Sequence, residues 1–472
     1  MNNLPVIPMP VFSRYLWMEE VTFSHIPIAT VITGFMTLAP IFEYIGYRKQ
    51  DMRYDRFAKS LIWFSMILFS PGAALGTGIP IIIIGLYPEF WARWANLFFA
   101  PLLIQFVLFL IEVVFLFFLY YLVWDRWQGK KKKLHMWMGT IAALVGLAIQ
   151  FIWDGLGSYM TTPNGVDLPG ALEPVIWNAK AFFNPSLAPL FVHRFFGNIS
   201  YPMLLVGGVF AMKYRRAKDP GEHEYFKFSS DLAISIGFIS FFAMPVIGWW
   251  FSKVLQEHAP AAYHAIMGGH TTIFIRIKLV GIAFFVIVGA MYTFIRHREK
   301  KALLYTISGL LGTLWIILTM HPDMHWLPGG VVVWRIAYTV IIGGFIALLW
   351  YLRGHREWSY SQKRKAWPRI LLAMGLSAVI VFAMGGSARE RARQPHSVYG
   401  QLAKPEVKDY ETAKFLVYTN CLPEGRSVRE LKEVDYSGMD DREILSQLCD
   451  SGDDLSENEA QLVVKALREG NI

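Results

Sequence analysis

The sequence predicts an all-α fold: a polytopic membrane helical bundle of about ten spans, followed by a small helical soluble C-terminal domain. Three observations support this class. The 472 residues are 54% hydrophobic and 17% charged, whereas a soluble domain carries roughly 25% charged residues. Apolar runs near the length that crosses a bilayer recur along the chain. Basic residues gather in alternate loops, as they do in proteins that cross the membrane repeatedly.

The candidate spans follow from the apolar runs. They lie near residues 20–46, 60–86, 97–123, 136–156, 188–212, 228–251, 272–295, 302–320, 333–352 and 367–389. The chain does not begin with a charged segment, a short apolar core and a small-residue cleavage site. We therefore expect no cleaved signal peptide, and we expect the first span to act as its own anchor.

Lysine and arginine predict the orientation of these spans. One set of alternate loops holds 25 of them, whereas the other set, with the first 19 residues, holds 4. The basic loops are 48–59, 124–135, 213–227, 296–301 and 353–369, and the opposite loops are 87–96, 157–187, 252–271 and 321–332. Because cytoplasmic loops carry the basic excess, we expect a multi-pass protein of a bacterial-type inner membrane with both termini on the periplasmic side.

Charge also excludes one class of partner. The net charge of +9 is spread over short loops, whereas nucleic-acid binding needs basic residues gathered on a soluble face. We therefore expect membrane lipid around the chain and no nucleic-acid partner.

Residues 401–472 differ from the transmembrane domain, residues 1–400, because they are polar and acidic with helical patterns. We expect a small soluble helical domain on the outer face. Cys421 and Cys449 both lie in it. A disulfide and two free thiols remain open alternatives on this oxidising side, since only geometry decides between them. The chain has no CxxCH sequence, so covalent c-type haem is not expected.

Titratable side chains near the outer ends of three predicted spans are candidate functional residues. His25 lies in the first span, His193 at the start of the fifth and Glu390 at the end of the tenth. Such groups are costly inside a membrane and mark functional sites. Each one alone fits an ordinary buried polar residue, but three at one depth favour metal or haem ligands, since imidazole is the commonest axial ligand of haem.

The glycine-rich stretch GAALGTGIP, residues 72–80, is a weaker candidate for a site. No lysine follows it, and it lies within an apolar span. Close packing of helices therefore explains it better than phosphate binding.

Five segments resemble, in order and in spacing, subunit I of the cytochrome bd oxidases. They are ERARQP at 390–395, NPSLAPLFVHRFFG at 184–197, His25 with Glu43 later in the same span, APLLIQF to WDR within 100–126, and WRIA at 334–337. The first resembles that family's haem-binding E-x-G-R-Q-P-W segment, and the second resembles its NP…F-V-H segment. The resemblance covers most of residues 15–400.

The resemblance implies roles for these residues. His25 and Glu390 would bind the irons of an active di-haem pair and form the catalytic centre, and His193 would bind a separate low-spin b haem. Arg335 and Arg393 would lie beside the haems, where a guanidinium pairs with a propionate through a planar fork. The implied cofactors are two or three b haems, with haem d as an alternative. A second membrane subunit is the implied partner.

The sequence differs from the family pattern at a ligand of the low-spin haem. Ala337 stands where the family has a methionine ligand. Either that haem is absent, or its iron has five ligands, or another residue replaces the methionine. The candidate substitutes are His321, Met324 and His325 of one outer loop, and His396, which stands where the family has tryptophan. An ordinary polar loop remains an alternative for them.

The residues that correspond to the family's proton path and quinol site also differ from the family pattern. Gln105 replaces a family carboxylate of the proton path, and Glu112 corresponds approximately to a second one. The long quinol-binding loop is missing. Lys253 and Glu257 are either a remnant of the family's quinol-contacting pair or an ordinary surface ion pair one helical turn apart.

The C-terminal domain offers a hint about the electron donor. ETAKFLVYTNC at 411–421 and DLSENEAQLVVKALR at 454–468 resemble the first and last helices of a small cytochrome c that lacks the haem-attaching CxxCH. We expect an outer c-type cytochrome or a quinol as donor.

The leading hypothesis is a haem-bearing electron-transfer subunit at the outer membrane face, with oxygen as one acceptor. One alternative is an electron conduit between a quinone pool and a respiratory partner without oxygen reduction. Another is a haem-depleted scaffold of a respiratory complex. A transporter is a weaker alternative, because the sequence shows no convincing internal repeat.

Overall fold

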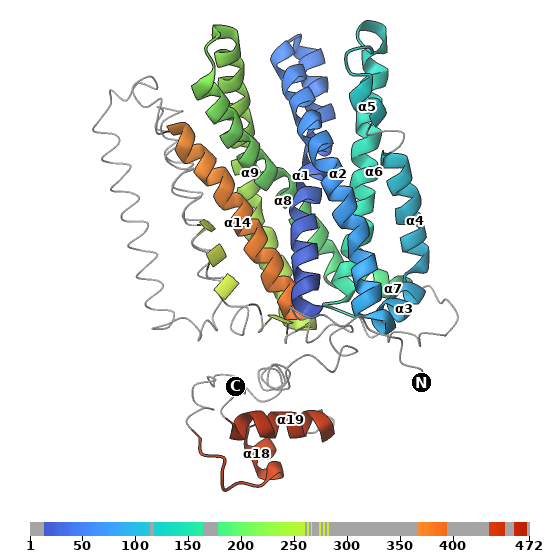
Figure 1. Ribbon diagram of the computed structural model, residues 1–472, viewed down its shortest axis with the longest axis vertical. Coiled ribbons are helices and arrows are strands. Elements are labelled where there is room, and N and C mark those ends of the chain that lie inside the picture. Colours follow the sequence, from blue (N-terminus) through green and yellow to red (C-terminus); the bar gives the residue numbers. More distant parts are fainter. Residues whose placement is uncertain are drawn as a thin grey trace, which may run out of the picture.

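The computed structural model describes residues 14–113, 118–163, 178–259, 262–263, 266, 273–274, 277–278, 281–282, 367–393, 434–448 and 457–469, and every regular element in these ranges is helical. Seven of the described helices are long and apolar enough to cross a membrane. They form a bundle of side-by-side helices (Figure 1). The predicted all-α membrane fold is confirmed.

Seven of the ten predicted spans coincide with these helices. They begin at Trp17, Met52, Phe99, Gly129, Leu187, Pro220 and Pro368. The predicted span at 272–295 falls on scattered described residues, and those at 302–320 and 333–352 lie outside the described residues.

Helices α1 (Arg14–Lys49) and α2 (Met52–Leu86) meet in a connection much shorter than the predicted loop 48–59. Asp51 begins α2 because its side chain accepts a hydrogen bond from the backbone N–H of Arg53 at 3.0 Å, which is the usual role of an N-cap. Gln50 takes a positive φ of 55° in the turn. The predicted loop residues are therefore mostly helical, because the helices continue beyond the apolar core.

The segment predicted as the outer loop 87–96 is also helical. It forms α3 (Pro88–Leu97), which buries Phe90, Trp94 and Leu97 against the bundle. Pro88 suits the first helical position, where no N–H bond is needed. After α3 come α4 (Phe99–Leu110), α5 (Phe118–Leu122), the 3₁₀ turn η2 (Gly129–Lys131) and α6 (Lys132–Tyr159).

The second half of the bundle is α7 (Ala179–Phe182), α8 (Leu187–Arg216), α9 (Pro220–His258) and α14 (Trp367–Arg393). The predicted loop 213–227 shrinks to residues 217–219, since Asp219 caps α9 by accepting from the backbone N–H of Glu222 at 2.8 Å. Helix α9 also extends into the predicted loop 252–271, as far as His258.

Helix α8 is central, because it packs against α1, α6, α9 and α14. Glycines let α8 and α14 approach closely. A Cβ placed on Gly208 would lie 2.8 Å from the carbonyl oxygen of Leu371, and one on Gly375 would lie 2.8 Å from that of Leu204. Such contacts between backbones are typical of packed membrane helices.

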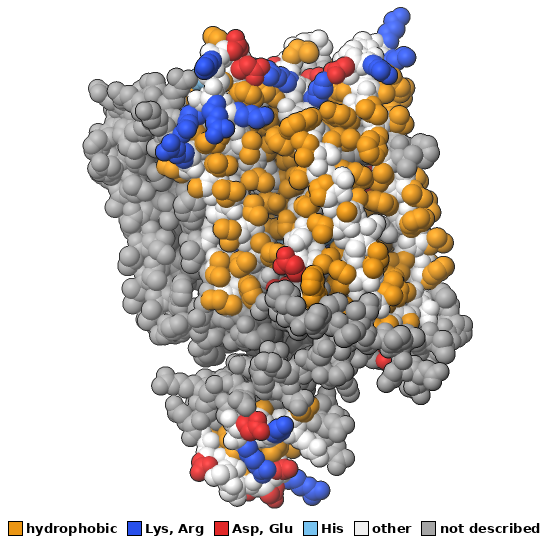
Figure 2. All heavy atoms as spheres, viewed as in Figure 1, with side chains coloured by type: hydrophobic (Ala, Val, Ile, Leu, Met, Phe, Trp, Pro, Cys, Tyr) orange, Lys and Arg blue, Asp and Glu red, His pale blue; other side chains and the backbone are white. Residues whose placement is uncertain are grey.

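The surface of the bundle has a broad apolar band, and Lys and Arg gather at one end of it (Figure 2). Helix α1 finishes at this end with Arg48 and Lys49, and α8 finishes there with Arg215 and Arg216. We call it the basic end. The band agrees with lipid around the helices, since an apolar surface of this extent is unusual on a soluble monomer.

Part of the expected C-terminal domain is described. Helices α18 (Asp441–Leu448) and α19 (Glu457–Arg468) pack against one another. Their shared core includes Ile444, Val463 and Leu467. The boundary at residue 401, the resemblance to a cytochrome c and the outer location remain predictions, and Cys421 and Cys449 lie outside the described residues.

Candidate functional site

His25 lies on α1 with its ring against α2. Its Nδ1 is 3.0 Å from the carbonyl oxygen of Gly72. Since that oxygen only accepts, Nδ1 carries the proton and Nε2 keeps its lone pair, which is the usual arrangement of a metal-binding histidine. A Cβ on Gly76 would lie 2.7 Å from Cε1 of His25. The glycine-rich stretch therefore makes room for this imidazole, in agreement with the expected role in helix packing.

His193 lies near the start of α8 and faces α9. Its Nδ1 is buried and has no hydrogen-bond partner among the described residues. The ring of Phe251 lies beside it, with a centroid distance of 6.3 Å and an angle of 29° between the ring planes. A Cβ on Gly248 would lie 3.7 Å from Cε1 of the histidine. A buried polar atom without a partner costs roughly 1–3 kcal/mol, so this ring needs an explanation.

Glu390 lies near the end of α14 and is only 3% exposed. One turn earlier, a Cβ on Gly386 would lie 3.8 Å from Cε2 of Phe23. The end of α14 therefore packs beside the part of α1 that carries His25. Because α1 and α8 begin where α14 ends (Figure 1), His25, His193 and Glu390 all lie toward the end opposite the basic end.

A buried polar network near His25 was not predicted from the sequence. Arg194 pairs with Asp154 of α6, which is 1% exposed. Gln150 donates to Asp154 at 3.2 Å, and Asn198 donates to Gln150. Arg194 is also close enough to His25 for its charge to act on the ring. An aspartate in an apolar span was the signal that sequence reasoning missed.

These residues fit a haem better than a bare metal ion. Within the described ranges, no group of three or more His, Cys, Asp or Glu is arranged to hold a metal ion. A haem brings its own nitrogen ligands and needs only one or two from the protein. His25 offers a free Nε2, which suits one such ligand.

Comparison with known proteins decides the family. The family model of the cytochrome bd terminal oxidase subunit I matches residues 13–419. The chain belongs to this family. Among curated proteins, none matches. Among solved structures, the bd oxidase from Geobacillus thermodenitrificans matches with a TM-score of 0.56 and 18% identity, over 83% of this chain and 89% of that chain. At this identity the match shows a shared fold.

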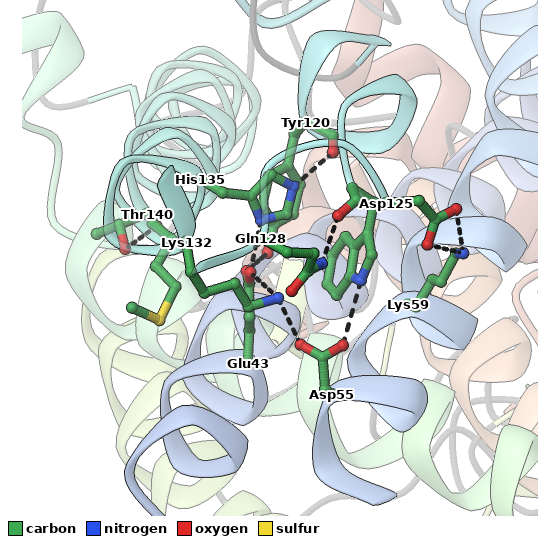
Figure 3. A network of polar contacts seen from close by, with 11 residues as sticks. Glu43, Asp55, Lys59, Tyr120, Asp125, Gln128, Lys132, His135 and Thr140 are labelled. Atoms are coloured by element: carbon green, nitrogen blue, oxygen red, sulfur yellow. Dashed lines mark hydrogen bonds and ion pairs between the residues drawn. The ribbon is translucent and has the colours of Figure 1, made fainter. Parts of the chain in front are cut away.

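This member of the bd subunit I family also has a buried charged cluster near the basic end (Figure 3). Glu43 is fully buried and accepts from Tyr120 at 2.6 Å, from His135 at 2.5 Å and from Lys132 at 2.8 Å. Lys132 also contacts Asp55 at 2.6 Å. We call these five residues the Glu43 cluster. Only Glu43 was noted in the sequence, as part of the family resemblance.

Polar groups of the Glu43 cluster satisfy one another. Nδ1 of His135 faces the carboxylate of Glu43, and Nε2 lies 2.8 Å from the carbonyl oxygen of Tyr120. Both partners only accept, so both ring nitrogens are satisfied when both carry a proton. Lys132 contacts the carboxylates of both Glu43 and Asp55, at 2.8 Å and 2.6 Å, so each acid has a cationic partner.

The structure describes some of the remaining site candidates. Glu112 packs against α6, because a Cβ on Gly146 would lie 2.8 Å from its Oε1. Gln105 is partly buried on α4. Lys253 donates to Gln256 at 2.9 Å, so the surface ion pair considered for Lys253 and Glu257 is not formed in the described part of the chain.

The side chains of the remaining candidates lie outside the part of the chain that the structure describes. Those outside the described residues are Arg335, Ala337, His321, Met324, His325 and His396. Arg393 is the last residue of α14, and its side chain lies outside the described part. The roles of all these residues remain predictions.

Proposed function

We propose that this chain is the haem-bearing electron-transfer subunit of a bd-type complex in a bacterial inner membrane. Electrons move at the outer face, and oxygen is the acceptor at a haem pair bound by His25 and Glu390. His193 binds a further b haem. The observation that carries the proposal is the hydrogen bond between Nδ1 of His25 and the carbonyl oxygen of Gly72 at 3.0 Å, because it leaves Nε2 free to bind iron, as in other metal-binding histidines.

The bound haems would supply one-electron redox chemistry and an iron site for a gas molecule. The residues of the chain hold and orient them. The hydrogen bond from His25 to Gly72 fixes which imidazole nitrogen is free to coordinate. Glu390 presents a carboxylate from α14 at the same end of the bundle. Arg194, paired with Asp154, places a positive charge near His25.

Reduction of oxygen consumes protons as well as electrons, and polar groups follow one face of α6. His135, Gln150 and Asp154 share this face by helical spacing, and the carboxylate of Glu112 approaches it at Gly146. This series runs from the basic end toward His25. This series favours the hypothesis that the chain reduces oxygen over the alternative of an electron conduit.

One observation favours the alternative of an electron conduit without oxygen reduction. Gln105 stands where the family has a carboxylate, and an amide does not carry a proton by ionising. The haem-depleted scaffold is less well supported, since His25, His193 and Glu390 would then be costly groups in a membrane without a role.

The partners follow from the same proposal. A quinol or an outer c-type cytochrome donates electrons, and the C-terminal helices α18 and α19 belong to a docking domain for the donor. A second membrane subunit or lipid covers α4, whose side chains Phe99, Leu103, Phe106 and Leu110 are exposed.

The test is haem content of the purified chain, measured by a pyridine haemochrome spectrum, together with reduced-minus-oxidised spectra with and without carbon monoxide. Two or three b or d haems with a carbon monoxide response support oxygen reduction. Haem without this response supports the conduit. A chain without haem contradicts the proposal and leaves the scaffold.

A further inference from the structure

A pocket of about 300 Å³ lies near the basic end, between α2, α5 and α8. Three cations line it: Arg56 and Lys59 from α2, and Lys213 from α8. Trp63 and Phe64, one turn further along α2, form its apolar wall. The pocket is remote from His25, His193 and Glu390, which lie toward the other end of the bundle. The proposed haem chemistry does not use it.

Two of the three cations already have carboxylate partners. Arg56 contacts Glu222 at 2.6 Å, and Lys59 contacts Asp125 at 2.6 Å. Lys213 has no ion pair with a described residue. Its Nζ lies instead near aromatic rings, 5.8 Å from the centroid of Phe64 and 6.0 Å from that of Trp63. The pocket therefore keeps a net positive charge that an anion would neutralise.

The depth of the pocket is that of a membrane interface. Lys213 lies one turn before the end of α8, and Arg56 lies in the second turn of α2. Below them Trp63 is 45% exposed, and Ile67, one turn further along the same face, is 53% exposed. Figure 2 shows Lys and Arg gathered above an apolar band at this end. Tryptophan is enriched at this depth in membrane proteins.

Cations above an exposed apolar strip match a ligand with an anionic head and an apolar tail. A phosphate group carries the negative charge, and its oxygens accept hydrogen bonds from ammonium and guanidinium groups. Basic pockets between helices on the cytoplasmic side suit anionic lipid headgroups. Free phosphate has the same charge, but it would make no use of Trp63 and Ile67.

We propose that this pocket binds the phosphate of an anionic membrane phospholipid. Lys213 and Lys59 contact the headgroup, and one acyl chain lies along Trp63 and Ile67. Lipid binding here ties α2 to α8 at the membrane surface. The inference is independent of haem binding.

The test uses the full chain in detergent and native mass spectrometry with added phosphatidylglycerol or phosphatidylcholine. Lys213→Gln is expected to weaken phosphatidylglycerol binding about five-fold, the effect of one basic residue near an anionic headgroup. Phosphatidylcholine binding is expected to stay unchanged. The matched control is Arg216→Gln, which removes an exposed cation from the same helix outside the pocket. It is expected to leave both affinities unchanged.

A second variant distinguishes a loss of lipid binding from a folding defect. Lys213→Arg keeps the positive charge and is expected to bind phosphatidylglycerol as the native chain does. Equal loss in Lys213→Gln and Arg216→Gln would show a general surface-charge effect and overturn the proposal. Inorganic phosphate that displaces phosphatidylglycerol at equal concentration would overturn the lipid as ligand, since the tail would then add nothing.

Discussion

The imidazole of His135 lies 2.5 Å from the carboxylate of Glu43, and both side chains are fully buried. The two residues come from different helices, α6 and α1. Lys132 contacts the same carboxylate at 2.8 Å. His135 and Lys132 therefore share one buried carboxylate, and Lys132 also contacts Asp55 at 2.6 Å.

Replacing Glu43 with Gln is expected to destabilise the protein by about 3–5 kcal/mol, because removal of one partner of a buried ion pair leaves the other charge uncompensated. Thermal unfolding in detergent measures this. The control is Glu224→Gln, which removes an exposed ion pair between Arg53 of α2 and Glu224 of α9 and is expected to cost about 0–1 kcal/mol. Equal unfolding temperatures for the two variants would contradict the structural role of Glu43.

Replacing Gly76 with Ala is expected to displace the ring of His25, since the added Cβ would lie 2.7 Å from Cε1. We expect the absorption signal of the haem bound by His25, the high-spin signal, to shift or disappear. Gly78→Ala is the matched control, because a Cβ at Gly78 meets open space on the same helix. Identical spectra for both variants would show that His25 does not bind haem.

Replacing His193 with Ala is expected to remove one b haem from the purified protein. The haem-to-protein ratio from the pyridine haemochrome spectrum measures this loss. His258→Ala changes an exposed histidine at the end of α9 and is expected to leave the ratio unchanged. An unchanged ratio in the His193 variant would reject His193 as a ligand.

Replacing Glu390 with Gln is expected to perturb the high-spin signal while leaving the haem at His193 in place. The amide keeps the size of the side chain but is a poorer ligand for iron than a carboxylate. Reduced-minus-oxidised spectra separate the two signals. If spectrum and activity stay intact, the carboxylate of Glu390 has a structural role only.

Sequence reasoning found the candidate ligands because titratable residues are rare and conspicuous in apolar spans. His25, His193 and Glu390 were visible for this reason, and the structure places them toward one end of the bundle. Sequence reasoning did not find the ends of the helices. Residues such as Lys59 and Lys213 are polar but helical, because backbone hydrogen bonds continue past the apolar core once a cap such as Asp51 is available.

The sequence by itself determined the helical membrane bundle and its basic end. A bilayer offers no partner for a backbone polar group, so an apolar run of sufficient length must form a helix. Only the tertiary structure decided which charged groups meet. Glu43 and His135 are 92 residues apart, and Asp154 and Arg194 are 40 residues apart. Their pairing depends on how neighbouring helices cross and rotate, and small contact residues such as Gly208 and Gly375 determine this by close packing rather than by local periodicity.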